Sequence, residues 1–323
     1  MSMSSAARWQ GVGVFLFMGT LGCSSPDAGG DLTMGDPSVL AGTFQVTLVA
    51  PDTVTGTAGY TSLVGKVNDG ATPASVQWTT VTTSGDCTLR KPRVPFCNTP
   101  CGSSAVCVDD NLCQAYPKAA SAGTVHASGI RTTAGGTEFD LQQVAGSYQP
   151  ASGISLPFPA FAEGDTIRLT SSGGAYAAMT LTSQGIAPLQ ITSSMLQLTP
   201  GQGARLQWTQ AKDPAASKIS VKLDISHHGG TKGMIECTTA DSGNLDLPAG
   251  LISDLINLGT AGYPTIVVTR SANPGSTVIA PGRVDLNLVS TVEQAVVVPG
   301  VVSCTSTADC PMSTSCQSDL TCK

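Results

Sequence analysis

The chain has 323 residues and a formal net charge of −6, and charged residues make up only 12% of it, about half the usual share. This composition excludes a nucleic-acid-binding protein, which needs clusters of Lys and Arg, and a protein of long amphipathic helices, which needs straight-chain charged residues. The 36 Gly and 20 Pro instead suit strands and turns, so we expect an all-β fold.

The N-terminus has the pattern of a secretory signal. Residues 1–10 are polar with one cation, Arg8, and residues 11–21 are uncharged and largely apolar. Eleven residues are too few to span a hydrocarbon core, which needs about 20 in a helix. We therefore predict a signal peptide over 1–22, cleaved before Cys23, and a flexible tether over 23–37. No later stretch reaches the length of a membrane-spanning helix.

The residues around Cys23 resemble a bacterial lipoprotein signal, in which a small residue precedes the cysteine that receives diacylglycerol. Gly22 and Cys23 match that pattern, whereas Thr20 and Leu21 depart from it because Leu usually stands three positions before the cysteine. The resemblance implies a lipid anchor on Cys23, and Ser24 after it favours the outer membrane. The alternative is an ordinary secreted protein with one leftover thiol.

Short strands with frequent turn signals follow the tether. Residues 44–49 and 75–81 alternate apolar and polar side chains, and Trp78 in the second run is expected to anchor a core. Further strands are expected at 123–130, 137–141, 166–170 and 175–181. This spacing predicts a β-sandwich-like, Ig-like domain over 38–199, with a cysteine-rich insertion at 87–113.

A second β-sandwich-like domain is predicted over 200–298. Its clearest strand is 218–225, which places Ile219, Val221, Leu223 and Ile225 on one face. That strand and 234–237 are expected to pair as a hairpin around the loop 227–231. Apolar residues at helical spacing predict one short helix over 248–258. Strands at 265–270 and 283–289 complete the domain, and 299–323 forms a cysteine-rich tail.

Ten cysteines after Cys23 are disulfide candidates. Two polar runs share an interval of five residues between cysteines, and such runs bury too little surface to fold without covalent links. Even spacing and the export signal favour disulfides over zinc. Four tail cysteines allow three pairings, of which we favour Cys304–Cys316 with Cys310–Cys322, and Cys237 is either the sixth member of the central set or a buried free thiol. The candidates are Cys87, Cys97, Cys101, Cys107, Cys113, Cys237, Cys304, Cys310, Cys316 and Cys322.

The tail also resembles the C-x₅-C-x₅-C modules of uncharacterised, myxobacterial-type predicted lipoproteins. The stretch from Asp86 to Cys113, followed by the residues 123–129, is similar to the same group. The resemblance implies a surface location and β structure, and it implies no activity.

The residues that could carry chemistry are few. His126 is expected on a strand face, and His227 and His228 would point to opposite faces if their strand continued, which suits a metal poorly. Asp241-Ser242-Gly243 is similar to the surroundings of a serine-protease nucleophile, but its flanks differ and no histidine lies in a matching context. Asp241, Asn244 and Asp246 could supply oxygens to Ca²⁺, although a turn explains them better. The run 109–111 is expected to be a solvated loop. We predict no catalytic residue, metal or cofactor.

These observations predict a non-catalytic cell-envelope lipoprotein with a structural or adhesive role. Its partners would be the membrane, through the lipid anchor, and other envelope proteins or extracellular ligands; it would be secreted if Cys23 is not lipidated. The first alternative is a carbohydrate- or peptide-binding module. The second is a hydrolase with a site near the His227 loop, formed with Asp224 and Asp241.

Overall fold

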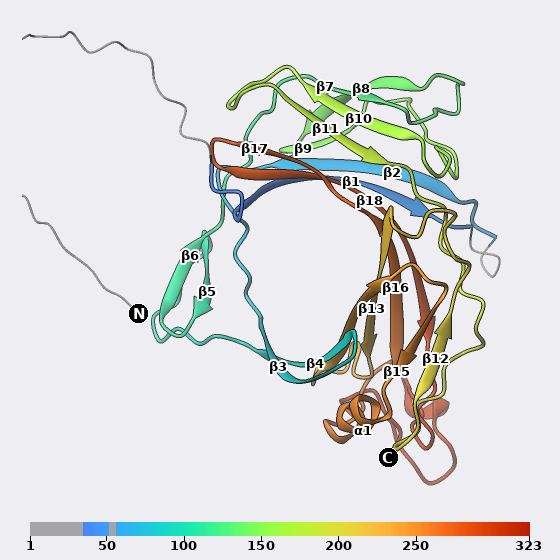
Figure 1. Cartoon of the computed structure of the whole chain (residues 1–323). Helices are drawn as coiled ribbons and strands as arrows, with labels where there is room; N and C mark the ends of the chain where they lie inside the picture. Colours follow the sequence, from blue (N-terminus) through green and yellow to red (C-terminus); the bar gives the residue numbers. More distant parts are fainter. Residues whose placement is uncertain (1–34, 52–55) are drawn as a thin grey trace, which may run out of the picture. The chain divides into compact units, whose positions relative to one another are not determined.

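The computed structural model describes residues 35–51 and 56–323, and in them the chain is all-β with one short α-helix (Figure 1). The signal peptide predicted over 1–22, Cys23 and most of the tether predicted over 23–37 lie outside the described residues. Residues 34–323 form one compact unit.

Most of the strands predicted in the first half of the chain are present, although β3 has no buried residue, and there are additional strands that the sequence pattern did not reveal. The strands of this half are β1 (Leu40–Val49), β2 (Tyr60–Val67), β3 (Gln77–Ser84), β4 (Cys87–Arg93), β5 (Ala105–Asp109), β6 (Leu112–Ala115), β7 (Val125–Ser128), β8 (Glu138–Val144), β9 (Ser147–Pro150), β10 (Thr166–Ser171) and β11 (Met179–Gln184).

The second half contains the remaining strands and the helix, which begins and ends within one residue of its predicted bounds. Its elements are β12 (Ala204–Gln207), β13 (Ser217–Asp224), β14 (Met234–Ala240), β15 (Asn244–Leu247), α1 (Ala249–Asn257), β16 (Thr265–Ala272), β17 (Gly275–Ile279), β18 (Gly282–Ala295) and a 3₁₀ turn at Thr307–Asp309.

One sheet of 14 strands runs through both predicted domains. Its order is β11-β10-β7-β8-β9-β2-β1-β18-β16-β13-β14-β4-β3, with β17 paired to β18. The β1–β18 pair is parallel, and β13 and β14 pair as the predicted hairpin. The 14-residue β18 joins β1 on one side to β16 on the other, so hydrogen bonds cross the boundary predicted near residue 200.

The first hydrophobic core lies where strands β7 to β11 cover β1, β2, β17 and β18, as in a sandwich. Phe44 and Tyr148 are central to it, with ring centroids 5.7 Å apart. Gly65 stands beside them because a Cβ at this position would lie 2.1 Å from the Phe44 ring. Ile279, Val284, Leu286 and Leu288 belong to this core, so segments on both sides of residue 200 build it.

The second core lies under β4, β13, β14 and β16. Ile219, Val221, Leu223 and Ile225 are buried in it, as their alternation predicts. The layer that covers them is the two-stranded pair β12–β15 together with α1 and the segment 189–198, rather than a second large sheet. Leu89 and Cys87 of β4 also belong here.

The insertion predicted at 87–113 is therefore shorter than expected. Strand β4 pairs with both β3 and β14 in the main sheet, because Cys87 and Leu89 alternate with half-buried neighbours and have a core to face. The inserted part is the β5–β6 hairpin, which forms its own two-stranded sheet.

Candidate functional site

Asp241 is fully buried in an ion pair with Arg270. The Nε of Arg270 donates to Oδ2 of Asp241 over 2.6 Å, and Nη2 donates to Oδ1 over 3.0 Å. Trp208 Nε1 and Ser217 Oγ add one hydrogen bond each, both 2.7 Å. Arg270 also donates to the carbonyl oxygens of Ala187, Pro188 and Thr209. Both carboxylate oxygens of Asp241 already accept two hydrogen bonds each, so Asp241 is a structural residue. It has no free oxygen with which to attack a substrate, accept a proton or bind Ca²⁺.

Two opposing effects act on the pKa of Asp241. Burial raises the pKa, but the hydrogen bonds from Arg270, Ser217 and Trp208 together lower it by more than burial raises it. The pKa therefore lies below its ordinary value. The carboxylate therefore stays ionised inside the core.

The other candidate Ca²⁺ ligands face a cation. Asn244 Oδ1 accepts a hydrogen bond from Arg205 Nη2 over 3.0 Å, and Asp246 Oδ1 lies 3.5 Å from Arg205 Nη1. A guanidinium at this position repels Ca²⁺, so the three residues do not form the site considered above. Asp109 and Asp110 are likewise paired with Arg93, at 3.0 and 2.7 Å.

The two adjacent histidines lie side by side. The ring centroids of His227 and His228 are 3.9 Å apart, and His228 has a left-handed backbone with φ of +63°. The strand does not continue to these residues, because β13 ends at Asp224 and both histidines lie in the predicted loop, so the condition for opposite faces is not met. Among the described residues, the groups of three or more potential metal ligands include no histidine.

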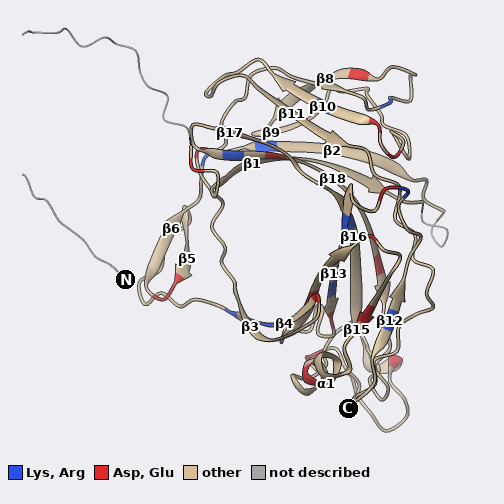
Figure 2. Cartoon of the chain, viewed as in Figure 1, with Lys and Arg blue, Asp and Glu red and all other residues tan. Residues whose placement is uncertain are grey.

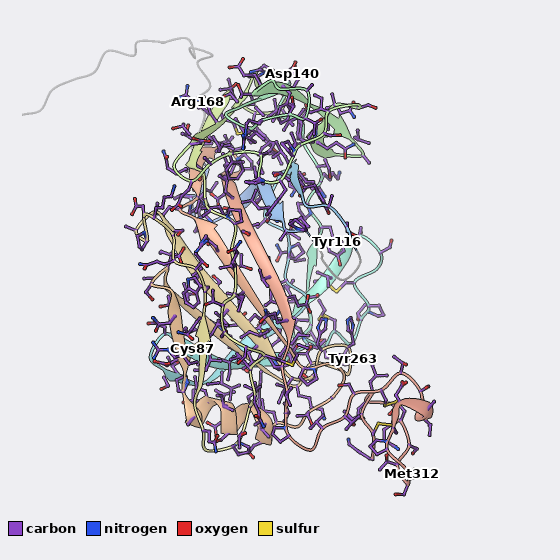
Figure 3. The ribbon with its side chains drawn as sticks, turned by 90° about the vertical axis from the view of Figure 1, so that its right-hand side faces the viewer. Cys87, Tyr116, Asp140, Arg168, Tyr263 and Met312 are labelled. Carbon is purple, nitrogen blue, oxygen red and sulfur yellow. A yellow bond between two sulfur atoms is a disulfide. The ribbon has the colours of Figure 1, made fainter. Side chains whose placement is uncertain are left out.

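Asp224 shapes this loop rather than activating a histidine. Its Oδ1 accepts hydrogen bonds from the backbone N and Oγ of Ser226, at 2.8 and 2.9 Å. Asp241 lies in its own ion pair, so the two carboxylates named for a hydrolase already have other partners. The cysteine-rich tail packs next to the loop. Ser303 Oγ donates to the Gly262 carbonyl, and Gly262 N donates to the Asp319 carbonyl. Tyr263 N, beside Gly262, donates to the His227 carbonyl of the loop. Figure 3 shows Met312 at the far end of this tail, away from Tyr263.

His126 lies on a face of β7, as predicted. Its Nδ1 is 2.8 Å from Oδ1 of Asp140, and its Nε2 is 3.9 Å from Oε2 of Glu138 on the neighbouring strand β8. The imidazole and both carboxylates are largely exposed, so this is a cross-strand surface pair.

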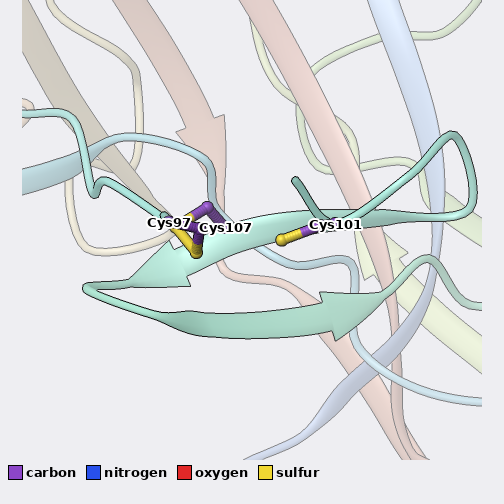
Figure 4. A group of neighbouring side chains, drawn as sticks. All are labelled: Cys97, Cys101 and Cys107. Carbon is purple, nitrogen blue, oxygen red and sulfur yellow. A yellow bond between two sulfur atoms is a disulfide. The ribbon is translucent and has the colours of Figure 1, made fainter. Parts of the chain in front are cut away.

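All ten cysteines of the described residues are joined in disulfides, which confirms both favoured tail pairs and makes Cys237 the sixth member of the central set. The pairs are Cys87–Cys237, Cys97–Cys107, Cys101–Cys113, Cys304–Cys316 and Cys310–Cys322. Cys97, Cys101 and Cys107 lie close together (Figure 4), but in disulfides they offer no thiolate to zinc. The hairpin and the tail share the same interleaved connectivity.

A polar face of β4, β13, β14 and β16 lies opposite the second core. It holds a depression of about 530 Å³ whose lining includes Arg90, Ser220, Lys222, Glu236 and Thr269. A neighbouring depression of about 500 Å³ shares Asp86 and Thr238 with it and adds Lys218. Charges are sparse elsewhere on the strands (Figure 2), so this face combines hydroxyl groups with a few charges of both signs.

Trp78 lies at the edge of this face and is not the core anchor that the sequence predicts. The Nζ of Lys222 lies 6.0 Å from the centroid of the Trp78 ring. Arg90 Nε is 3.0 Å from Glu236 Oε2 without hydrogen-bond geometry. Arg90 and Lys222 therefore line the depression, and the Trp78 ring lies near the Lys222 ammonium group. The depression can contact a polar ligand through charge and hydroxyl groups, with an aromatic ring nearby.

The most constrained polar residue, Arg270, was missed in the sequence. Its signal was its position: Arg270 occupies the same face of β16 as Ile266, Val268 and Ala272. A cation on a buried face needs a buried anion, and Asp241 is that anion.

No described helix is long and apolar enough to cross a membrane. Five disulfides are typical of a protein that folds outside the reducing cytosol. No protein-family model matches the chain, and no curated protein sequence matches it.

Proposed function

We propose that this chain is a non-catalytic cell-envelope lipoprotein, anchored through Cys23, with a structural or adhesive role. The observation that carries the proposal is the complete pairing of the other ten cysteines among themselves. None of them is left to pair with Cys23 within the chain. A single unpaired cysteine after an apolar leader is the residue on which a lipid would be placed.

The ionisable groups support a role without catalysis. Asp241 accepts hydrogen bonds from Arg270, Ser217 and Trp208, Asp224 accepts hydrogen bonds from Ser226, and His126 pairs with Asp140. The proposed protein is a cross-linked β scaffold that presents its loops and its polar sheet face to the exterior.

Metabolic labelling with an alkyne fatty acid tests the anchor. We expect label on the wild type and none on Cys23→Ala, with membrane-bound protein converted to soluble protein. Ser24→Ala is the matched control, because it changes the neighbouring residue and retains the thiol. Equal labelling of the wild type and Cys23→Ala would remove the proposal.

Binding of a carbohydrate or peptide is the second candidate, favoured by the depression beside Trp78 and Lys222. An array of neutral and anionic oligosaccharides and of short peptides provides the probes. Trp78→Ala and Lys222→Ala should each weaken binding of the probe about five- to thirtyfold, since stacking and charge contribute about 1–2 kcal/mol each. Lys91→Ala, outside the depression, is the control; equal effects of all three variants would place the binding elsewhere.

A further inference from the structure

The β5–β6 hairpin and the residues on either side of it carry a group of exposed apolar side chains. Val94, Phe96, Leu112 and Tyr116 are 73, 69, 57 and 48% exposed. These four are drawn from the segment 94–116 alone, whereas the other large exposed apolar side chains of the described residues are spread over the rest of the chain. We call these four residues the apolar strip. Clustered apolar exposure of this kind marks a surface that meets an apolar partner.

The strip is held in place rather than left free. Cys97–Cys107 and Cys101–Cys113 clamp the hairpin. The Phe96 backbone accepts a hydrogen bond from Asn111 N over 3.0 Å and donates one to Asp110 Oδ1 over 3.1 Å. This fixes Phe96 against the turn that precedes Leu112, so the apolar side chains remain in solvent although the backbone is well ordered.

The charge around the strip is nearly balanced. Both carboxylates of the hairpin turn, Asp109 and Asp110, pair with Arg93. The remaining charged residues between 91 and 118 are Lys91 and Lys118, so this segment contains three cations and two anions. Figure 2 accordingly shows the hairpin almost entirely without charge except at its turn. A nearly neutral apolar surface suits a zwitterionic lipid interface better than a strongly charged partner.

The strip is connected to the end of the body from which the anchor departs. Gly35 N donates to the Ile279 carbonyl, and Ala41, six residues later, accepts a hydrogen bond from Asn68. The residue after Asn68 is Asp69. Its Oδ1 accepts a hydrogen bond from Lys118 N over 2.7 Å, and its backbone N donates to the Lys118 carbonyl over 3.0 Å. Tyr116 stands two residues before Lys118. The start of the described chain and the base of the hairpin are thus attached to the same end of β1 and β2.

The distance from the anchor is limited by covalent geometry. Twelve residue steps separate Cys23 from Gly35, and they span at most about 40 Å when fully extended. A lipid on Cys23 therefore keeps this end of the body near the membrane surface, where the strip can reach the lipid.

We infer that the apolar strip inserts into the interface of the membrane to which Cys23 is anchored and so orients the body on the lipid surface. The inference rests on the proposed anchor. Val94, Phe96 and Leu112 contact acyl chains, while Tyr116 places its hydroxyl among the headgroups.

Fluorescence of the lipidated chain in phosphatidylcholine vesicles tests the inference. Phe96→Trp adds an indole to the strip, and its emission is obtained as the difference from the wild type, which has its own Trp78 and Trp208. We expect this added emission to shift to the blue and to fall at least twofold when the acyl chains are brominated. Met312→Trp is the control, since Met312 is 97% exposed at the far end of the tail, and we expect no quenching there.

The outcomes separate this inference from the proposed anchor. If Cys23 is labelled but the added emission of Phe96→Trp is not quenched, the strip does not touch lipid and the anchor stands. If Cys23→Ala is labelled like the wild type, the proposed anchor is wrong. Quenching of the added emission of Phe96→Trp would then show that the strip contacts lipid without the anchor, and its absence would overturn the inference as well. A blue shift without quenching by bromolipid would show that the indole is shielded by the protein itself rather than by lipid, and it would overturn the lipid inference.

Discussion

At the scale of single residues, the feature that most constrains this protein is the buried ion pair of Asp241 and Arg270. Removing charges from water is costly, and the cost is offset here by four hydrogen bonds to one carboxylate. Arg270 also binds the carbonyl oxygens of Ala187 and Pro188, which fixes the segment that leads from one core to the other.

Asp241→Asn should therefore destabilise the protein by about 3–5 kcal/mol, because it leaves the Arg270 guanidinium buried without a counter-charge. Denaturant unfolding under non-reducing conditions measures the loss. Asp246→Asn, in the exposed pair with Arg205, is the control and should cost under about 1 kcal/mol. A similar small cost for both variants would contradict the structural role of the buried pair.

The same pair predicts a pH dependence. The pKa of Asp241 is lower in the folded state than its unfolded value of about 3.9, so its contribution is complete above about pH 4 and is lost as the pH falls through the folded pKa. We expect the free energy of unfolding to decrease over this range and to decrease less steeply in Asp241→Asn. Parallel pH profiles for the two proteins would refute the assignment.

At the scale of elements, disulfides act in two different ways. Cys87–Cys237 joins β4 to β14 across 150 residues of sequence, inside the second core. The hairpin and tail disulfides close short segments, with partners 10 or 12 positions apart in the sequence. The first restrains the whole sheet, whereas the others stabilise small polar modules that have little core of their own.

Cys87→Ala with Cys237→Ala should lower the stability of the body by about 2–5 kcal/mol, because the long loop regains its entropy in the unfolded state. Cys310→Ala with Cys322→Ala should leave the main unfolding midpoint unchanged and only expose the tail to protease. Unfolding monitored by Trp208 fluorescence and limited proteolysis of both variants provide the comparison. An equal shift of the main midpoint in the two variants would show that the tail is part of the body's cooperative unit.

The period of the apolar residues was sufficient to predict β13 and the helix α1, and the short loop 227–231 predicted the pairing of β13 with β14. The period was not sufficient for β2, where Gly65 and exposed Val64 obscure it, or for β4, whose cysteine suggested an insertion. Period-two patterns report which face is buried but not which strand lies beside another.

At the scale of the whole molecule, one sheet connects the two cores. Strand β18 pairs with β1 and with β16, and β4 pairs with β14. Each core therefore depends on strands from both sides of residue 200: Leu286 and Leu288 complete the first core, and Leu89 completes the second.

Separate fragments 35–199 and 200–323 should therefore fail to fold, because each lacks strands that close its core. Amide NMR spectra should be poorly dispersed for both fragments and well dispersed for the chain 35–323. Two well-dispersed fragment spectra would instead support independent domains divided near residue 200.

The sequence by itself determined the strand-rich class, the short helix, the disulfide modules and the buried face of β13, because composition, side-chain period and cysteine spacing are local properties. Only the tertiary structure decided the roles of Asp241, Trp78 and Cys237. Each role depends on a partner far along the chain, Arg270, Lys222 and Cys87 respectively, and long-range strand order brings those partners together.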